Sequence, residues 1–292
     1  MSSPLPTTVA DRLESMQALD PPAGVIGKAV RDAVPRGPVK DALSGTWLGH
    51  ALHPLLTDLP IGTFTSALLL DFLGGAGARD AADRLIAIGL AAAPATFATG
   101  WNDWADTEPA NDGVRRTGLV HAALNGTAVG LMAASLAARR RGARGRGKLL
   151  GLAGASLLGA GGWIGGHLSY AQGVGVDTTV FDPGPEDWTG TGIREPELDD
   201  GRPRCADVAG VPVLVVRHGG VLRALHNRCT HRAGSLADGE VADGAVTCPL
   251  HGSVFSLEDG SVRRGPAPYP QPRFEARTAS AGGEVEVRRV AP

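Results

Sequence analysis

Two cysteines and two histidines stand in two short clusters near the end of the chain. Cys229 and His231 share the stretch CTHRAG, and after sixteen further residues Cys248 and His251 share CPLHGSVF. Thiolates and imidazoles bind zinc and iron well, so the clusters predict a metal centre. Zinc fingers separate the first pair by two to four residues and usually place the second on a helix. The one-residue spacing here favours a two-iron cluster, with zinc as the alternative.

Short β-like runs surround both clusters and must position them. Gly-containing turns separate these runs, a pattern typical of a small antiparallel β domain of about 100 residues. The expected strands cover residues 211–217, 221–225, 253–257, 273–278 and 284–290. We therefore expect the two clusters at the tips of two hairpin-like loops.

The two clusters, followed by RRGPAPYP, resemble a Rieske iron–sulfur domain over residues 195–292. The resemblance implies a [2Fe–2S] cluster in which two cysteines hold the inner iron and two histidines the outer iron. The implied ligands are Cys229, His231, Cys248 and His251. The resemblance also implies that Ser253 supplies a hydroxyl near the cluster and that Pro266 belongs to the loop that covers it.

This sequence departs from the Rieske proteins of cytochrome bc complexes. Those proteins carry a further pair of cysteines, whose positions are taken here by Ala233 and Leu250. An aromatic residue that carries a hydroxyl in that group is Phe255 here. Fewer hydrogen bonds to the sulfurs stabilise the reduced state less, so we expect a lower potential, as in Rieske ferredoxins.

An oxygenase would need a second iron site with open positions. The sequence ends at Pro292, just after the last β-like run, and we expect no such site. The β domain is therefore interpreted as an oxidoreductase-type electron carrier without a substrate site of its own.

Four apolar stretches precede the β domain. The last two contain no Asp, Glu, Lys or Arg and exceed the ~20 residues needed to cross a bilayer. The stretches cover residues 55–73, 85–101, 117–138 and 149–171. We predict a multidomain chain, an all-α transmembrane four-helix bundle followed by a small all-β Rieske domain. The expected parts are a tail (1–50), the transmembrane domain (51–175), a linker (176–194) and the Rieske domain (195–292).

The membrane half also resembles a known family. The patches GHALHPLLTDLPIG (49–62) and GGHLSYAQGVGV (165–176) resemble a four-helix bacterial membrane family of unknown function. The Arg-rich loop 138–148 should be cytoplasmic, because positive loops stay inside. With four spans, the Rieske domain is then expected on the outer face of a bacterial cell membrane.

Three histidines lie near one face of the predicted bundle. Counting along the spans places His53, His121 and His167 near the end opposite the Arg-rich loop. Ionisable groups inside spans are usually functional, and a bundle can hold haem between facing helices. We interpret His121 and His167 as a candidate axial pair for haem b, with His53 next. A second metal, or interfacial histidines without a ligand, are the alternatives.

Composition limits the partners. The net charge of −2, without a basic stripe, argues against nucleic acid as a partner. The expected partners are a lipid bilayer and a redox partner protein or quinone. Three functions remain open: electron transfer at the membrane, donation of electrons to a separate oxygenase or reductase, and a redox-sensing or binding module.

Overall fold

The structure, a computed structural model, describes residues 5–280 and 283–290. It divides into two compact units. The helical unit comprises Met1–Pro35 and Leu52–Val174, and the β unit comprises Arg36–Ala51 and Gly175–Pro292. Residues 36–51 thus group with the β strands although they lie between two helices of the other unit. The chain passes between the units three times, at residues 35–36, 51–52 and 174–175.

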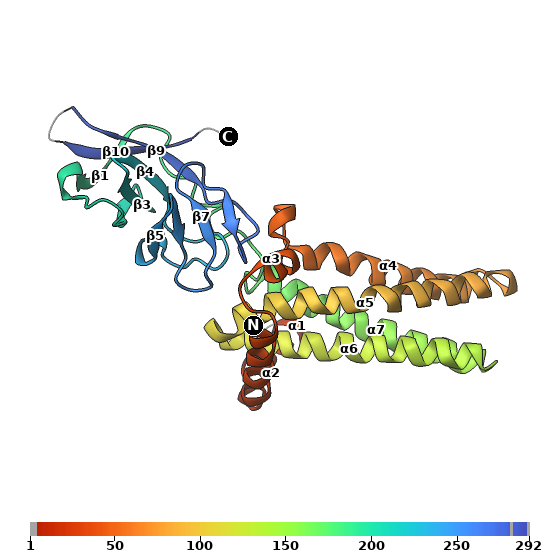
Figure 1. Cartoon of the computed structure of the whole chain (residues 1–292). Coiled ribbons are helices and arrows are strands. Elements are labelled where there is room, and N and C mark those ends of the chain that lie inside the picture. Colours follow the sequence, from red (N-terminus) through yellow and green to blue (C-terminus); the bar gives the residue numbers. More distant parts are fainter. Residues whose placement is uncertain (1–4, 281–282, 291–292) are drawn as a thin grey trace. The chain divides into compact units, whose positions relative to one another are not determined.

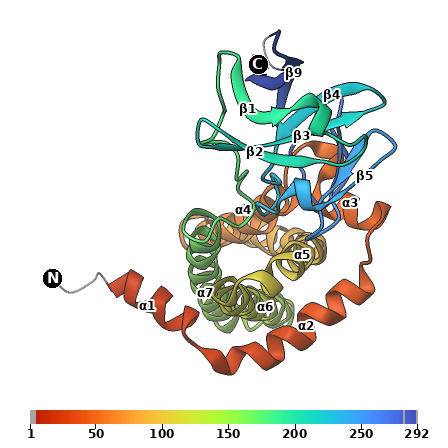
Figure 2. The same ribbon diagram turned by 90° about the vertical axis from the view of Figure 1, so that its left-hand side faces the viewer.

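Four long helices form the helical unit. Consecutive helices contact each other and the last contacts the first, which closes the bundle (Figures 1 and 2). All four are long and apolar enough to cross a membrane. The prediction of four spans is confirmed in this sense. The helices are α4 (Leu52–Leu73), α5 (Arg79–Thr107), α6 (Asp112–Arg140) and α7 (Arg144–Tyr170).

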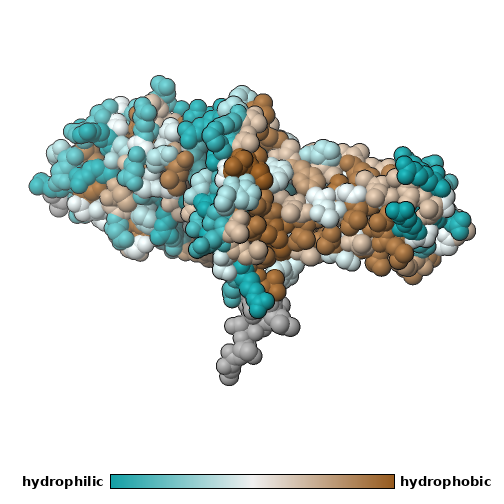
Figure 3. All heavy atoms as spheres, turned by 90° about the horizontal axis from the view of Figure 1, so that it is seen from below, coloured by the Kyte–Doolittle hydropathy of each residue, from teal (hydrophilic) through white to brown (hydrophobic). Residues whose placement is uncertain are grey.

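The bundle is apolar outside as well as inside. Phe64, Ile86 and Met132 are buried in its core, whereas Leu69 and Phe72 are 54% and 62% exposed. Figure 3 shows a largely hydrophobic helix surface, with hydrophilic side chains gathered at the right-hand end of the bundle in that view. A water-soluble bundle would present a polar face instead. The exposed apolar surface is what a lipid environment requires.

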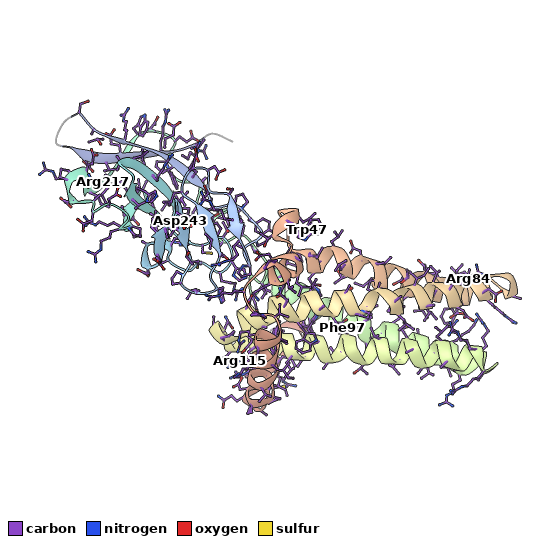
Figure 4. All side chains as sticks on the ribbon, viewed as in Figure 1. Trp47, Arg84, Phe97, Arg115, Arg217 and Asp243 are labelled. Carbon is purple, nitrogen blue, oxygen red and sulfur yellow. The ribbon has the colours of Figure 1, made fainter. Side chains whose placement is uncertain are left out.

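Ion pairs close both ends of the bundle, and Figure 4 shows Arg84 and Arg115 at these opposite ends with Phe97 between them. At the Arg84 end, Arg139 is fully buried and donates both terminal nitrogens to Asp71. The Arg115 end carries two further helices, α1 (Leu5–Glu14) and α2 (Asp20–Ala33). Arg116 on α6 donates two hydrogen bonds, of 2.8 and 2.6 Å, to the Asp20 carboxylate of α2. Part of the expected tail 1–50 is therefore a packed layer of this unit.

The β unit consists of two antiparallel sheets. The larger has the order β1-β10-β9-β4-β3-β2, and the smaller has the order β5-β6-β7-β8. One apolar cluster, around Val213 and Val285, lies on the larger sheet, and a second cluster joins Leu225 of the larger sheet to Val246 and Phe255 of the smaller one. This all-β domain confirms the predicted fold class.

The strands fall close to the expected runs, with additions. They are β1 (Thr189–Arg194), β2 (Arg204–Val208), β3 (Val211–His218), β4 (Val221–His226), β5 (Glu240–Ala242), β6 (Ala245–Thr247), β7 (Val254–Ser256), β8 (Val262–Arg264), β9 (Arg273–Thr278) and β10 (Glu284–Arg289). Strand β1 lies inside the stretch expected as a linker, where it pairs with β10. A short helix, α3 (Pro38–Ser44), and the 3-10 turn η2 (Thr46–Leu48) also belong to this unit.

Candidate metal centre

Two loops with the same backbone pattern carry the four predicted ligands. In the first, Cys229 N–H donates to Gly234 O and Ala233 N–H donates to Cys229 O, both at 2.8 Å. In the second, Cys248 N–H donates to Ser253 O at 2.8 Å, and Gly252 N–H donates to Cys248 O at 3.0 Å. The fifth residue of each loop has a positive φ, 56° at Ala233 and 79° at Gly252. Each cysteine therefore opens a tight turn that also projects a histidine.

The loops bring the four side chains together in two pairs. The thiols of Cys229 and Cys248 are buried in the same apolar cluster. The rings of His231 and His251 lie with centroids 5.0 Å apart at an interplanar angle of 87°. His231 Nδ1 is buried and has no hydrogen-bond partner among the described residues. Such an orphaned nitrogen is a free lone pair positioned for a metal.

The electrostatics of the loops suit metal-binding forms of these side chains. Burial lowers the pKa of His231 well below its usual value, and the neighbouring His251 lowers it further. The imidazole is therefore neutral, which is the form that binds metal. The Cys229 thiol lowers the pKa of Cys248, and the backbone N–H groups of Leu250 and His251 also lower it. The second loop thus stabilises a thiolate.

The donor set fits a two-iron cluster. The four side chains are two buried thiols and two imidazoles whose ring centroids lie 5.0 Å apart. A [2Fe–2S] cluster takes only two residues at each iron, with the cysteines and the histidines on different irons.

A third loop lies over the ligand loops and is fixed by Ser253. This side chain is fully buried, and its Oγ accepts a hydrogen bond of 2.9 Å from Ala267 N–H. Ala267 belongs to the loop 265–268 that contains Pro266. Because the hydroxyl oxygen accepts this bond, the hydroxyl proton remains available to another acceptor nearby.

Sequence reasoning missed the residue that ties the first ligand loop to this third loop. The buried Gln271 accepts from Thr230 N–H at 3.1 Å. Its Nε2 donates to the carbonyls of His226 and Arg228, both at 2.6 Å. A single Gln between two prolines carries no spacing signal, so only the fold reveals this role.

The histidines of the helical unit have different surroundings. His53 Nδ1 lies 3.0 Å from Thr96 O, and His121 Nδ1 lies 2.8 Å from Gly161 O. His167 Nε2, in contrast, lies 2.8 Å from a carboxylate oxygen of Glu14 on α1. His53 and His121 thus each face a backbone carbonyl of a neighbouring helix and His167 faces α1, while the axial pair His121 and His167, with His53 next, stays a prediction.

Comparisons with known families match both units. Residues 192–275 match the family model of the Rieske [2Fe–2S] domain. Residues 49–178 match the family DUF2231, described as a predicted membrane protein. The first match covers both ligand loops and the Pro266 loop, and the second covers all four long helices.

Curated relatives resemble the β unit. The ferredoxin subunit of anthranilate 1,2-dioxygenase from Burkholderia cepacia is 37% identical over 83 residues, which is 28% of this chain and 75% of that protein. The cytochrome b6-f complex iron–sulfur subunit of Chlorobaculum thiosulfatiphilum is 36% identical over 81 residues, 28% of this chain and 44% of that subunit. The carotenoid phi-ring synthase of Chlorobaculum tepidum is 44% identical over 71 residues, 24% of this chain and only 11% of that protein.

Solved structures also resemble the β unit. The ferredoxin of carbazole 1,9a-dioxygenase from Nocardioides aromaticivorans is 26% identical and has a TM-score of 0.33. The match covers 36% of this chain and 100% of that ferredoxin.

Proposed function

We propose that this chain, which belongs to the Rieske [2Fe–2S] domain family, is a membrane-tethered carrier of single electrons. The observation that supports this most is the meeting of two cysteines and two histidines at the tips of two matched loops. The relatives include a ferredoxin subunit and an iron–sulfur subunit of a cytochrome complex. The four apolar helices and the DUF2231 match support the membrane tether.

The ligand assignment follows from the two pairs of side chains. We assign Cys229 and Cys248 to the inner iron, because both thiols are buried in the apolar core of the β unit. We assign His231 and His251 to the outer iron, where they form the edge through which electrons leave. When bound, the cluster supplies a one-electron couple. Ser253 and the Pro266 loop keep water from the sulfurs.

The direction of the chain in the membrane follows from loop charge. The loop 138–148 retains Arg140, Arg141 and Arg146 at its surface, whereas Arg139 is buried against Asp71. Exposed arginines hold a short loop in the cytoplasm. We therefore place this loop inside the cell and the β unit on the outer side of a bacterial cell membrane. The partner there is a quinol or a redox protein.

Reconstitution in lipid vesicles tests the proposed transfer. We expect a short-chain quinol to reduce the cluster, with bleaching of its visible absorption and the appearance of a paramagnetic signal. The Cys248→Ser variant is the matched control and should lack both changes. A wild-type cluster that dithionite reduces but every quinol and redox protein leaves oxidised would contradict an electron-carrier role.

A second redox site in the helical unit is favoured by the arrangement of His53 and His121. A hydrogen bond from Nδ1–H to a backbone carbonyl fixes the tautomer with its lone pair on Nε2, and at His121 this Nε2 lies 3.3 Å from Asn125 Nδ2. Each imidazole packs where the neighbouring helix has a glycine. A Cβ at Gly100 would lie 2.7 Å from His53 Cε1, and a Cβ at Gly165 would lie 3.0 Å from His121 Cε1. We propose that His53 and His121 would hold haem b, which would supply a second one-electron couple.

Absorption spectroscopy tests the haem site. Membranes from cells supplied with haem precursor should show a Soret band that disappears in both His53→Ala and His121→Ala. The band should persist in His167→Ala, because Glu14 engages that side chain. A band that survives both single replacements, or no band in the wild type, would overturn this assignment.

Donation to a separate oxygenase is a second candidate function. It is favoured by the 37% identity to a dioxygenase ferredoxin subunit, of which the matched region covers three quarters. A soluble oxygenase that oxidises the reduced cluster faster than quinone does would select this role over exchange with the quinone pool.

A further inference from the structure

Residues 36–51, which we call the capping segment, lie against the ligand end of the β unit. They precede the first long helix by sequence but group with the β strands in space. The segment is α3 with its flanking residues and η2. Neither family match reaches its first thirteen residues, 36–48.

One hydrogen bond joins the capping segment to the loop over the cluster site. Asp41 Oδ1 accepts from Gly265 N–H at 3.0 Å, although the two residues are 224 positions apart. Gly265 opens the loop that contains Pro266. A Cβ at Gly265 would lie 2.3 Å from Thr46 Oγ1 and 3.0 Å from Asp41 Oδ1. A side chain at position 265 would collide with Thr46 and Asp41. Only glycine therefore lets the Pro266 loop pack this closely against the capping segment.

The segment also places positive charge beside the second ligand loop. The Arg36 guanidinium occupies the space next to Gly252, where a Cβ would meet its Cζ and Nε at 2.7 Å. Gly252 directly follows His251 and hydrogen-bonds the carbonyl of Cys248. Lys40 is a second cation of the segment, and its side chain is buried. The capping segment therefore brings a positive charge to the loop that carries Cys248 and His251.

We propose that the capping segment is part of the cluster site, and that Arg36, held in place by the Asp41–Gly265 hydrogen bond, raises the cluster's reduction potential. Reduction adds one negative charge to the cluster, and a nearby cation stabilises that charge. Arg36 is a positioning residue in this account, since it touches a ligand loop and not the irons. The inference rests on the proposed [2Fe–2S] cluster.

Redox titration of the full-length protein in detergent, followed by the cluster's paramagnetic signal, tests the charge. Arg36→Gln should lower the equilibrium constant for reduction of the cluster roughly tenfold. This change lowers the reduction potential of a one-electron couple by about 59 mV. Arg36→Lys should restore most of the potential. The control is Arg277→Gln on β9. Arg277 lies beyond Arg273 and Phe274, the β9 residues that pair with β4, and β4 leads into the first ligand loop. An unchanged potential in Arg36→Gln, or an equal fall in Arg36→Lys, would overturn the proposal.

Two replacements of Asp41 test the hydrogen bond, because they should shift the potential in opposite directions. Asp41→Asn keeps an acceptor for Gly265 N–H but removes a negative charge, so the potential should rise. Asp41→Ala releases the segment with its two cations, so the potential should fall. A rise in both variants would show that the segment stays in place without the bond. Loss of the paramagnetic signal in the wild type would instead refute the proposed cluster.

Discussion

At the scale of single residues, the site combines a rigid backbone with a few polar side chains aimed at its centre. Each ligand loop closes on its own cysteine through two backbone hydrogen bonds. Gln271 accepts a hydrogen bond from Thr230 N–H in the first ligand loop, and Ser253 accepts one from Ala267 N–H in the loop that contains Pro266. Because these groups are buried, the loss of one partner leaves another group unsatisfied.

Ser253→Ala should lower the cluster's reduction potential without removing the cluster. The change deletes a hydroxyl proton that can stabilise the charge of the reduced sulfurs, and it leaves Ala267 N–H without its acceptor. We expect a fall of roughly 30–60 mV, the size of about 1 kcal/mol for a one-electron couple. Potentiometric titration measures it, and Ser253→Thr, which keeps the hydroxyl, should remain close to wild type. A potential that rises in Ser253→Ala would contradict this role.

At the scale of elements, the turn between β7 and β8 depends on an ionised Asp259. Its Oδ1 accepts from Ser261 N–H at 3.0 Å and from Ser261 Oγ at 2.7 Å. These hydrogen bonds lower the pKa of Asp259 to about 2 from 3.8. The turn precedes the loop that covers the cluster site, so its stability bears on that cover.

Asp259→Asn should reduce the thermal stability of the β unit slightly, in a manner that depends on pH. A carboxylate whose folded pKa is depressed adds stability above the unfolded value of 3.8, and this is lost as pH falls towards 2. The difference in melting temperature between wild type and variant should therefore be constant from about pH 5 to 8 and shrink below pH 3.8. A difference that grows on acidification would refute this assignment.

The buried ion pair between α4 and α6 contributes more to the stability of the folded protein than Asp259 does. Arg139 and Asp71 are both within 1% of complete side-chain burial. Among the described residues, Asp71→Ala would leave Arg139 with Asp83 as its carboxylate partner, at 3.3 Å. We expect a loss of about 3 kcal/mol in stability, seen as a lower melting temperature in detergent. Asp58→Ala, at an exposed position of the same helix, is the control and should have little effect. Equal melting temperatures for both variants would contradict the role of the pair.

At the scale of the whole molecule, the proposed function requires one orientation of the chain in the membrane. Cys205 is an exposed native cysteine on β2, whereas Cys229 and Cys248 are buried. Partial shielding of the thiol from water and the nearby carboxylates of Asp238 and Asp207 raise the pKa of Cys205, so labelling should be faster at alkaline than at neutral pH. A membrane-impermeant maleimide should label Cys205 in intact spheroplasts. A cysteine introduced at the exposed Ala143 of the Arg-rich loop, in a Cys205→Ser background, should react only after permeabilisation. The reverse pattern would invert the proposed topology.

The sequence predicted those parts of the molecule that depend on local pattern. Four apolar runs of spanning length and five β-like runs correspond to α4–α7 and to β3, β4, β7, β9 and β10. The strands β1, β2, β5, β6 and β8 lie outside the expected runs, and the last three of them have only three residues each, too few for a period to be visible. Polar and Pro-containing residues 1–50 suggested a tail, yet α2 and the capping segment are fixed by long-range partners such as Arg116 and Gly265. Such partners leave no trace in spacing.

The nature of the metal centre decides the whole account, and one combined measurement addresses it. The protein is isolated without oxygen from membranes, analysed for iron, zinc and acid-labile sulfide, and reduced for EPR with nitrogen couplings resolved. We predict about two irons and two sulfides per chain, and a reduced spectrum coupled to two imidazole nitrogens. The coupling should change in His251→Cys. A preparation that contains zinc without labile sulfide, or a cluster whose spectrum is unaltered by His251→Cys, would contradict the central claim.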